Sequence, residues 1–354
     1  MRVLFVSNYP HLPDIKGGLQ TTTHDLCLAV GLAGAEAAVL CGLDEHGVSA
    51  GRPEPVEGLP SSAGSIARSD ESLGYLCMRA AAPDRVLPLV AAAWDASAIV
   101  VQSGTALLPM VLASLRTGRA TAVYLHNVEM HQLQGTLVAD PQLLYLANSD
   151  FTAERWRALC GLQCEVIPPV VRADGYIAAS NGPKVLFVNP TPIKGVELMF
   201  ALAAQCPDLS FLVVESWNLE PNWRQLCRHR ARTLGNVEWC SPTDDMRTVY
   251  SQARLLLMPS VWEESFGRTV VEAQLNGLPV LASNRGALPA TVGAGGLTLD
   301  PHAPVTDWAK ALRRLLVEHD AFSAAARSHA LGHVAATPLI VGRLLSLLSG
   351  HSAR

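Results

Sequence analysis

The sequence predicts an α/β fold of two parallel-sheet domains, and three observations support this prediction. The chain has 354 residues, a length that suits two domains better than one. Short apolar runs alternate with amphipathic helical stretches, which is the pattern of βα units in a parallel, doubly wound sheet. The apolar runs are continuous, as expected for strands that helices cover on both faces. We therefore expect one domain over residues 1–170, a second over residues 171–336, and a C-terminal helical segment over residues 337–354.

The composition fits an enzyme and argues against several other classes of protein. Hydrophobic residues make up 49% of the chain and charged residues 16%, which excludes a disordered chain. A formal net charge of −4 gives no reason to expect nucleic acid as a partner. No apolar run reaches the roughly 18 residues of a transmembrane helix. The eight cysteines lack metal-ligand spacing, which argues against a zinc site. We expect no metal and no cofactor. We expect the chain in the cytoplasm, either free or peripheral at the membrane face.

The alternation of strands and helices is clearest in the first half of the chain. Residues 43–70 interrupt it with Gly, Pro and Ser, and are predicted to form a long surface loop. Ser149 is a suitable N-cap for the helix that follows it. The predicted strands are Val3–Val6, Ala37–Cys41, Tyr75–Met78, Ile99–Gln102, Ala122–Leu125 and Tyr145–Ala147, and the predicted helices lie near Leu19–Ala33, Arg85–Trp94, Ala106–Leu115 and Thr152–Leu159.

Two features of this half are candidates for a binding site. Gly17 and Gly18 precede a helix, and paired glycines let backbone N–H groups approach a phosphate or a sugar closely. Their spacing is not G-x-G-x-x-G, which argues against a dinucleotide-binding unit. His126 follows a predicted strand, at the sheet edge where parallel α/β proteins bind ligands. The alternative for His126 is a loop histidine with a purely structural hydrogen bond.

The second half repeats the pattern after a stiff segment, Cys164–Asp174, that we expect to cross between the domains. Lys194 precedes a glycine and a helix at the end of the first strand of this half. Thr243 is a suitable N-cap for a helix over residues 244–253. Strands are predicted at Lys184–Val188, Phe211–Val214, Asn236–Ser241, Leu255–Met258 and Val280–Ala282, and later helices at Trp308–Glu318, Ala321–Ala330 and Pro338–Leu348.

The most informative stretch is Arg254–Ser283. A helix is predicted to begin near Arg268, directly after a polar loop that follows a parallel strand, and this arrangement binds anions. Glu264 and Glu272 frame it with seven residues between them. If most of that span is helical, they lie about 12 Å apart, which suits a ligand with hydroxyls at both ends and a diphosphate between them. The alternative is an ordinary βαβ turn with two surface glutamates.

The residues from Glu264 to Glu272 read E-S-F-G-R-T-V-V-E, with P-S upstream and E-A-x-x-x-G-x-P-V continuing from Glu272. This pattern resembles the E-x7-E signature of retaining glycosyltransferase family 4, which has the GT-B fold. The resemblance implies two Rossmann-like, doubly wound domains that face each other across a cleft, with the C-terminal helix packed back on the first domain. It also implies transfer of a sugar from a nucleotide diphosphate sugar to an acceptor hydroxyl, with retention of configuration.

The resemblance further implies roles for single residues. Glu264 would hold the hydroxyls of the transferred sugar, Glu272 those of the ribose, and His126 would hydrogen-bond the sugar. Lys194 matches a diphosphate-binding lysine, whereas Asn189 stands where the family usually has an arginine, and Ala290 where it often has a glutamate. The implied catalytic residues are His126, Lys194 and Glu264, and the implied donor-binding residues are Gly17, Gly18, Asn189, Trp239, Cys240, Ser265, Phe266, Gly267, Arg268, Thr269 and Glu272.

The sequence thus predicts a glycosyltransferase of the hexosyltransferase type. The alternative is a sugar-nucleotide-binding or epimerase protein of the same fold without transfer activity. No Asp-x-Asp pair is present to hold a divalent metal, so we expect metal-independent transfer. The nucleotide sugar is the expected donor, and the acceptor is a lipid-linked sugar, a small molecule or a glycan.

Overall fold

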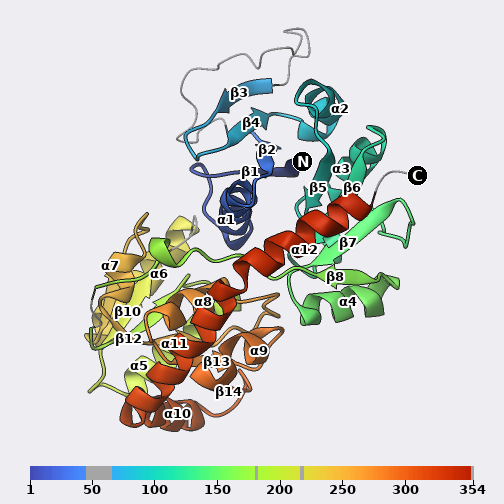
Figure 1. Ribbon diagram of the computed structural model, residues 1–354. Helices are drawn as coiled ribbons and strands as arrows, with labels where there is room; N and C mark the ends of the chain where they lie inside the picture. Colours follow the sequence, from blue (N-terminus) through green and yellow to red (C-terminus); the bar gives the residue numbers. More distant parts are fainter. Residues whose placement is uncertain (45–65, 180–181, 216–218, 352–354) are drawn as a thin grey trace. The chain divides into compact units, whose positions relative to one another are not determined.

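The computed structural model describes residues 1–44, 66–179, 182–215 and 219–351 (Figure 1). It divides into two compact units, which we call the first domain (Met1–Val170 with Thr337–Arg354) and the second domain (Val171–Ala336). Each is built on a mostly parallel sheet with helices between successive strands. The predicted fold class, two doubly wound parallel-sheet α/β domains, is confirmed.

The described residues of the first domain form an eight-stranded sheet in the order β3-β4-β2-β1-β5-β6-β7-β8. Its strands pair in parallel except β3 with β4, which are antiparallel. The strands are β1 Arg2–Pro10, β2 Glu36–Gly42, β3 Ile66–Asp70, β4 Leu76–Ala80, β5 Ala98–Gln102, β6 Ala120–Leu125, β7 Leu143–Ala147 and β8 Cys164–Val166, and the helices are α1 Gly18–Leu32, α2 Pro83–Ala93, α3 Leu107–Leu115, α4 Asp150–Cys160 and α12 Thr337–Gly350.

Two short edge strands of this sheet were not predicted. Ile66–Asp70, expected to belong to a loop, is β3, while residues 45–65 of that expected loop lie outside the described residues. Cys164–Val166, expected to begin the domain crossing, is β8. An edge strand pairs on one side only and needs no continuous apolar run, so it leaves little trace in the sequence. Ser149 caps α4 as predicted, since its side chain accepts the Thr152 N–H.

The described residues of the second domain form a parallel six-stranded sheet in the order β11-β10-β9-β12-β13-β14. Both faces are covered, because Val185 and Phe187 of β9 lie in one apolar cluster and Leu186 lies in another. The strands are β9 Lys184–Val188, β10 Phe211–Val214, β11 Val237–Cys240, β12 Ala253–Met258, β13 Val280–Ser283 and β14 Gly296–Leu299, and the helices are α5 Val196–Gln205, α6 Pro221–Leu234, α7 Arg247–Tyr250, α8 Arg268–Leu275, α9 Leu288–Val292, α10 Val305–Val317 and α11 His319–Ala335.

The helix predicted over residues 244–253 is wrong in its extent. Only Arg247–Tyr250 is helical, and Ala253 already begins β12. Thr243 accepts the Asp245 N–H, and Asp245 in turn accepts the Arg247 N–H. These two local side-chain turns hold the backbone out of a helix before residue 247.

The strand orders place two switch points in the molecule. In the first sheet β1 lies between β2 and β5, and in the second sheet β9 lies between β10 and β12. In doubly wound sheets, ligands bind beyond the carboxyl ends of the strands at such points. The loops that follow these strands are therefore where a site is expected in each domain.

The last two helices form a continuous apolar stretch, residues 319–350, that is long enough to cross a membrane by length and composition alone. A single helix of this kind is weak evidence for a membrane span. In α11, Ala330 packs against Leu275 of α8, and in α12, Ile340 and Leu344 are buried within the first domain. Arg343 of α12 also donates to Glu165 of β8 at 2.5 Å. These residues pack inside the protein, but only 22% of the most apolar window of the stretch is buried.

Candidate active site

The loops after β9, β12 and β13 pack tightly around the switch point of the second domain. Three glycines permit this contact. A Cβ on Gly195 would lie 2.0 Å from the Pro259 carbonyl oxygen, and one on Gly286 would lie 2.2 Å from that of Glu264. A Cβ on Gly267, the N-cap of α8, would lie 2.7 Å from Leu288. All three have a positive φ, so both space and backbone favour glycine.

Glu264 lies in this packed region and has a lysine partner. Lys194 donates to its Oε1 at 2.6 Å, and Ser260 donates to the same oxygen at 2.5 Å. Glu264 is 8% exposed and Ser260 is fully buried. The Glu264 carbonyl accepts the Ala287 N–H at 2.7 Å, which fixes the loop itself. The structure thus brings together Glu264 and Lys194, two of the predicted catalytic residues.

Glu272 lies in α8 and is held by a second cation. Arg268 donates through Nε to its Oε1 at 2.8 Å, and the Tyr250 hydroxyl donates to its Oε2 at 2.9 Å. The Arg268 guanidinium also lies over the ring of Tyr176, at 5.5 Å from its centre. Arg268 and Glu272 are 8% and 7% exposed. Because α8 begins at Arg268, only the part of the Glu264–Glu272 span after Gly267 is helical.

Asn189 follows β9 in a left-handed conformation, with φ of +65°. It is 5% exposed, and its backbone N–H donates to Val214 at 2.8 Å. Its Oδ1 and the nearby Thr191 Oγ1 are buried and have no hydrogen-bond partner among the described residues. Asn189 therefore brings no positive charge to the place where the resemblance implies an arginine.

The other predicted donor-binding residues of this domain have varied surroundings. Ser265 and Thr269 are partly exposed, and the Phe266 carbonyl accepts from the Thr291 hydroxyl at 2.5 Å. Trp239 and Cys240 are adjacent in β11 and pack in the clusters on opposite faces of the sheet. The structure therefore does not bring these two side chains together.

Glu215, the residue after β10, was not predicted as a site residue. It is 2% exposed and accepts from Trp239 Nε1 at 2.6 Å, from Arg224 at 2.8 Å and from Arg228 at 3.0 Å. The Glu215 carboxylate thus connects the Trp239 indole to Arg224 and Arg228 of α6. A carboxylate directly after a buried strand was the signal in the sequence.

The candidate site of the first domain has His126 at its centre, directly after β6. Its Nε2 lies 2.9 Å from Gln102 Oε1, and its backbone N–H donates to the Ser103 hydroxyl at 2.8 Å. Its ring lies 4.0 Å from that of Tyr124, centre to centre. Burial lowers the pKa of His126 to about 3, so the imidazole is neutral at pH 7.

Gly17 and Gly18 lie at the start of α1, which follows β1 in the same domain. Gly17 is the N-cap, in an extended conformation. A Cβ on Gly18 would meet no atom within 4 Å among the described residues. The packing of the chain therefore does not require a glycine at position 18.

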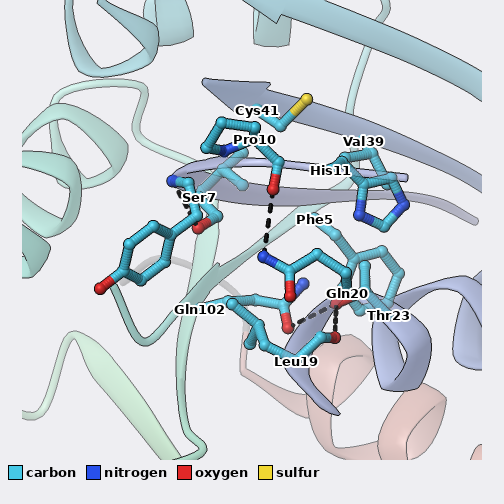
Figure 2. Close-up of a pocket in the computed structure, with 12 residues that line it drawn as sticks. Phe5, Ser7, Pro10, His11, Leu19, Gln20, Thr23, Val39, Cys41 and Gln102 are labelled. Carbon is cyan, nitrogen blue, oxygen red and sulfur yellow. Dashed lines mark hydrogen bonds between the residues drawn. The ribbon is translucent and has the colours of Figure 1, made fainter. Parts of the chain in front are cut away.

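A small pocket lined by both polar and apolar side chains lies between β1, β2, α1 and β5 (Figure 2). Gln20 donates to the Pro10 carbonyl at 3.1 Å, and the Thr23 hydroxyl donates to Gln102 Oε1 at 2.9 Å (Figure 2). Gln102 and Thr23 were missed by the sequence analysis. The sequence signal for Gln102 was weak. Gln102 ends β5 and His126 directly follows β6, and these neighbouring parallel strands end at the same sheet edge.

Within the described ranges, no three His, Cys, Asp or Glu side chains gather as a metal site. All eight cysteines of the chain lie in its described part, and each is a free thiol.

The fold and the site loops together define the class of protein that this chain resembles, the GT-B glycosyltransferases. Across 98–99% of the chain it is similar to solved structures of such enzymes. Sucrose-phosphate synthase from Thermosynechococcus elongatus superposes with a TM-score of 0.76 at 16% identity, covering 99% of this chain and 100% of that one. HepE of Anabaena, in complex with UDP-glucose, superposes with a TM-score of 0.73 at 19% identity, covering 98% of this chain and 99% of that one.

Sequence comparison leads to the same class of enzyme. Residues 182–318, all in the second domain, match the family model described as glycosyl transferases group 1. The D-inositol 3-phosphate glycosyltransferase of Corynebacterium glutamicum is 33% identical over 185 residues, which is 49% of this chain and 40% of that protein. That of Corynebacterium kroppenstedtii is 43% identical over 81 residues, 22% of this chain and 18% of that protein. The matches thus span less than half of these curated relatives.

Proposed function

We propose that this protein is a retaining glycosyltransferase that moves a sugar from a nucleotide diphosphate sugar to an acceptor hydroxyl. One observation carries the proposal: two carboxylate–cation pairs, the partly buried Lys194–Glu264 and the buried Arg268–Glu272, flank the N-terminus of α8. Helix N-termini and cations favour anions. A ligand with a diphosphate at its centre and hydroxyl groups on both sides has the charge pattern that this arrangement complements.

The donor is proposed to lie along this feature. The N–H groups at Gly267 and Arg268 and the Lys194 ammonium would face the diphosphate, with Asn189 beside them. Glu272 would accept from the ribose hydroxyls and Glu264 from the hydroxyls of the transferred sugar. Structures of the similar HepE contain UDP-glucose or UDP, so uridine nucleotides are the first donors to test.

The proposed chemistry depends on charge placed where it develops. Departure of the diphosphate leaves an oxocarbenium-like sugar and adds negative charge to the leaving oxygen. Lys194 and the α8 amides stabilise that oxygen without having to reorganise. Because Glu264 is bound to Lys194, we do not assign it as a covalent nucleophile. We propose attack by the acceptor on the face that the diphosphate leaves, with the leaving phosphate taking the acceptor proton.

The acceptor is proposed only by class. The family model covers the second domain, and the acceptor is expected on the first. The curated relatives are named for D-inositol 3-phosphate, which makes that compound the first acceptor to test, beside lipid-linked sugars and glycans. We expect the reaction in the cytoplasm or at its membrane face, which fractionation of cells will test.

The decisive experiment measures nucleoside diphosphate release from a panel of nucleotide sugars, with and without candidate acceptors. Slow release alone and fast release with an acceptor are expected, and NMR of the product should show the anomeric configuration of the donor. Tight binding without release would indicate a binding protein, and a changed sugar without transfer would indicate an epimerase. Activity should persist in excess EDTA, and its loss with rescue by Mg²⁺ or Mn²⁺ would overturn metal independence.

A further inference from the structure

Gln102 ends β5 beside His126 and is 4% exposed. Its Oε1 lies 2.9 Å from His126 Nε2 and 2.9 Å from the Thr23 hydroxyl. One amide oxygen therefore meets a ring of the candidate site and a side chain of α1, the helix that starts at Gly18. Both contacts are side chain to side chain, and neither is needed to complete a strand or a helix.

The chemistry of the three groups determines which ring nitrogen of His126 has the proton. A neutral imidazole has one N–H, and an amide oxygen can only accept. With Oε1 facing the ring, the proton must be on Nε2, and Nδ1 becomes the acceptor nitrogen. The Thr23 hydroxyl donates to the same oxygen and so keeps this side of the amide toward the ring. The tautomer of a histidine is set by the partner of one nitrogen in this way.

We propose that Gln102 is a positioning residue for His126, which fixes the Nε2–H tautomer and the orientation of its imidazole. Only the expected effect on turnover rests on the proposed function, whereas the tautomer of His126 does not depend on it. Thr23 acts through Gln102 and more weakly, because its single hydroxyl proton also lies within reach of the Leu19 carbonyl at 2.8 Å. In this tautomer the ring lone pair is on Nδ1, so this nitrogen can only accept hydrogen bonds.

The first test is spectroscopic and needs no substrate. In protein labelled with ¹⁵N-histidine, the His126 resonances are assigned by their loss in His126→Asn. A protonated Nε2 and an unprotonated Nδ1 are expected at pH 7. Gln102→Leu should give a mixture of tautomers, whereas Gln102→Glu should keep the Nε2–H form, since an ionised carboxylate can only accept. A proton on Nδ1 in the unaltered protein, or an unchanged tautomer in Gln102→Leu, overturns the inference.

The second test is kinetic. Gln102→Leu should lower kcat about ten- to a hundredfold, the usual effect of a displaced catalytic group, and leave the Kd for the nucleoside diphosphate unchanged. Gln102→Glu should recover most of that loss, and Thr23→Val should lose severalfold less than Gln102→Leu. Equal losses in the Leu and Glu variants would show that the amide acts only in packing.

Thr121→Val is the matched control. Thr121 is fully buried near the start of β6, the strand that precedes His126, and its hydroxyl lies 2.8 Å from that of Ser114. This variant loses a buried hydrogen bond far from the carboxyl end of β6, so thermal stability should fall while kcat and the His126 tautomer stay the same. If no donor is turned over but the tautomers behave as stated, only the proposed function fails. If transfer occurs with a proton on Nδ1, only the positioning role fails.

Discussion

The candidate site of the second domain is built from charged side chains, most of them buried, whereas that of the first domain is built from neutral hydrogen-bonding groups. In the second domain Glu264 and Glu272 each hold a cation at 2.6 and 2.8 Å. In the first domain a neutral His126 contacts Gln102 and Ser103. Both sites lie at the carboxyl edge of a parallel sheet.

The difference concerns the free-energy cost of burying each kind of group. A buried charge without a partner is costly, which is the physical reason that the carboxylates of the second domain are paired with cations. A site of neutral groups has no such cost and can be oriented by ordinary hydrogen bonds. We therefore expect substitutions in the second domain to act on charge and those in the first domain to act on geometry.

The largest effect is expected from Lys194→Ala, which should lower turnover about 10²- to 10³-fold, as loss of a transition-state donor does. The change leaves Glu264 buried without its cation, and Asn189 supplies none. Lys184→Ala is a matched control, because Lys184 is similarly exposed (20% against 17%) and pairs with Glu238 at 2.6 Å. Steady-state rates of both variants test whether Lys194 acts in turnover. Equal losses of rate would show that Lys194 has no role in the site.

The next effect separates the two glutamates. Glu272→Ala should weaken nucleoside diphosphate binding by roughly 1.5–3 kcal/mol, about ten- to a hundredfold, because one end of the ligand loses a charged acceptor. Glu264→Ala should leave that affinity nearly unchanged and lower turnover instead. Calorimetric titration of UDP into both variants tests this division, and it fails if the two affinities drop together.

A smaller effect should distinguish a glycine required by a ligand from one required by packing. Gly18→Ala meets no described atom within 4 Å, so the fold should be unchanged or stabilised by up to about 1 kcal/mol. Donor turnover should nevertheless fall about tenfold if a phosphate or sugar approaches this backbone. Gly286→Ala places a Cβ 2.2 Å from the Glu264 carbonyl oxygen and should lower the thermal stability of the second domain. Thermal melts and rates of both variants are the measurements, and a destabilised Gly18→Ala contradicts the comparison.

The smallest effect concerns acid. Burial lowers the pKa of His11 and of His126 to about 3, so between that value and the pKa of an unfolded histidine the unfolded chain binds more protons. Stability of the first domain should therefore fall as the pH drops, by about 2 kcal/mol per histidine from pH 6.5 to pH 5. Pulse proteolysis in urea measures the stability of each domain at each pH, because fragments of the two domains can be told apart. His11→Gln should reduce the dependence, and an identical dependence in that variant would contradict it.

The stretch around α8 shows how far the sequence alone could lead. The predicted helix start at Arg268 and its end at Asn276 agree with α8, because a glycine with a positive φ precedes it and an Asn-Gly pair stops it. The strands on either side were predicted from their continuous apolar runs. The edge strands β3, β8 and β14 were missed, since their pairing depends on a neighbour and not on their own pattern.

Sequence by itself therefore determined the α/β class, the order of most strands and helices, and the candidate residues that follow strands. Those features depend on local signals: apolar runs, caps, glycines and residue spacing. Only the tertiary structure decided which side chains meet. Lys194 and Glu264 are 70 residues apart, Gln102 and His126 are 24 apart, and Glu215 and Trp239 are 24 apart. These pairs form because parallel strands bring distant loops to one sheet edge, and sheet order is a property of the whole folded chain.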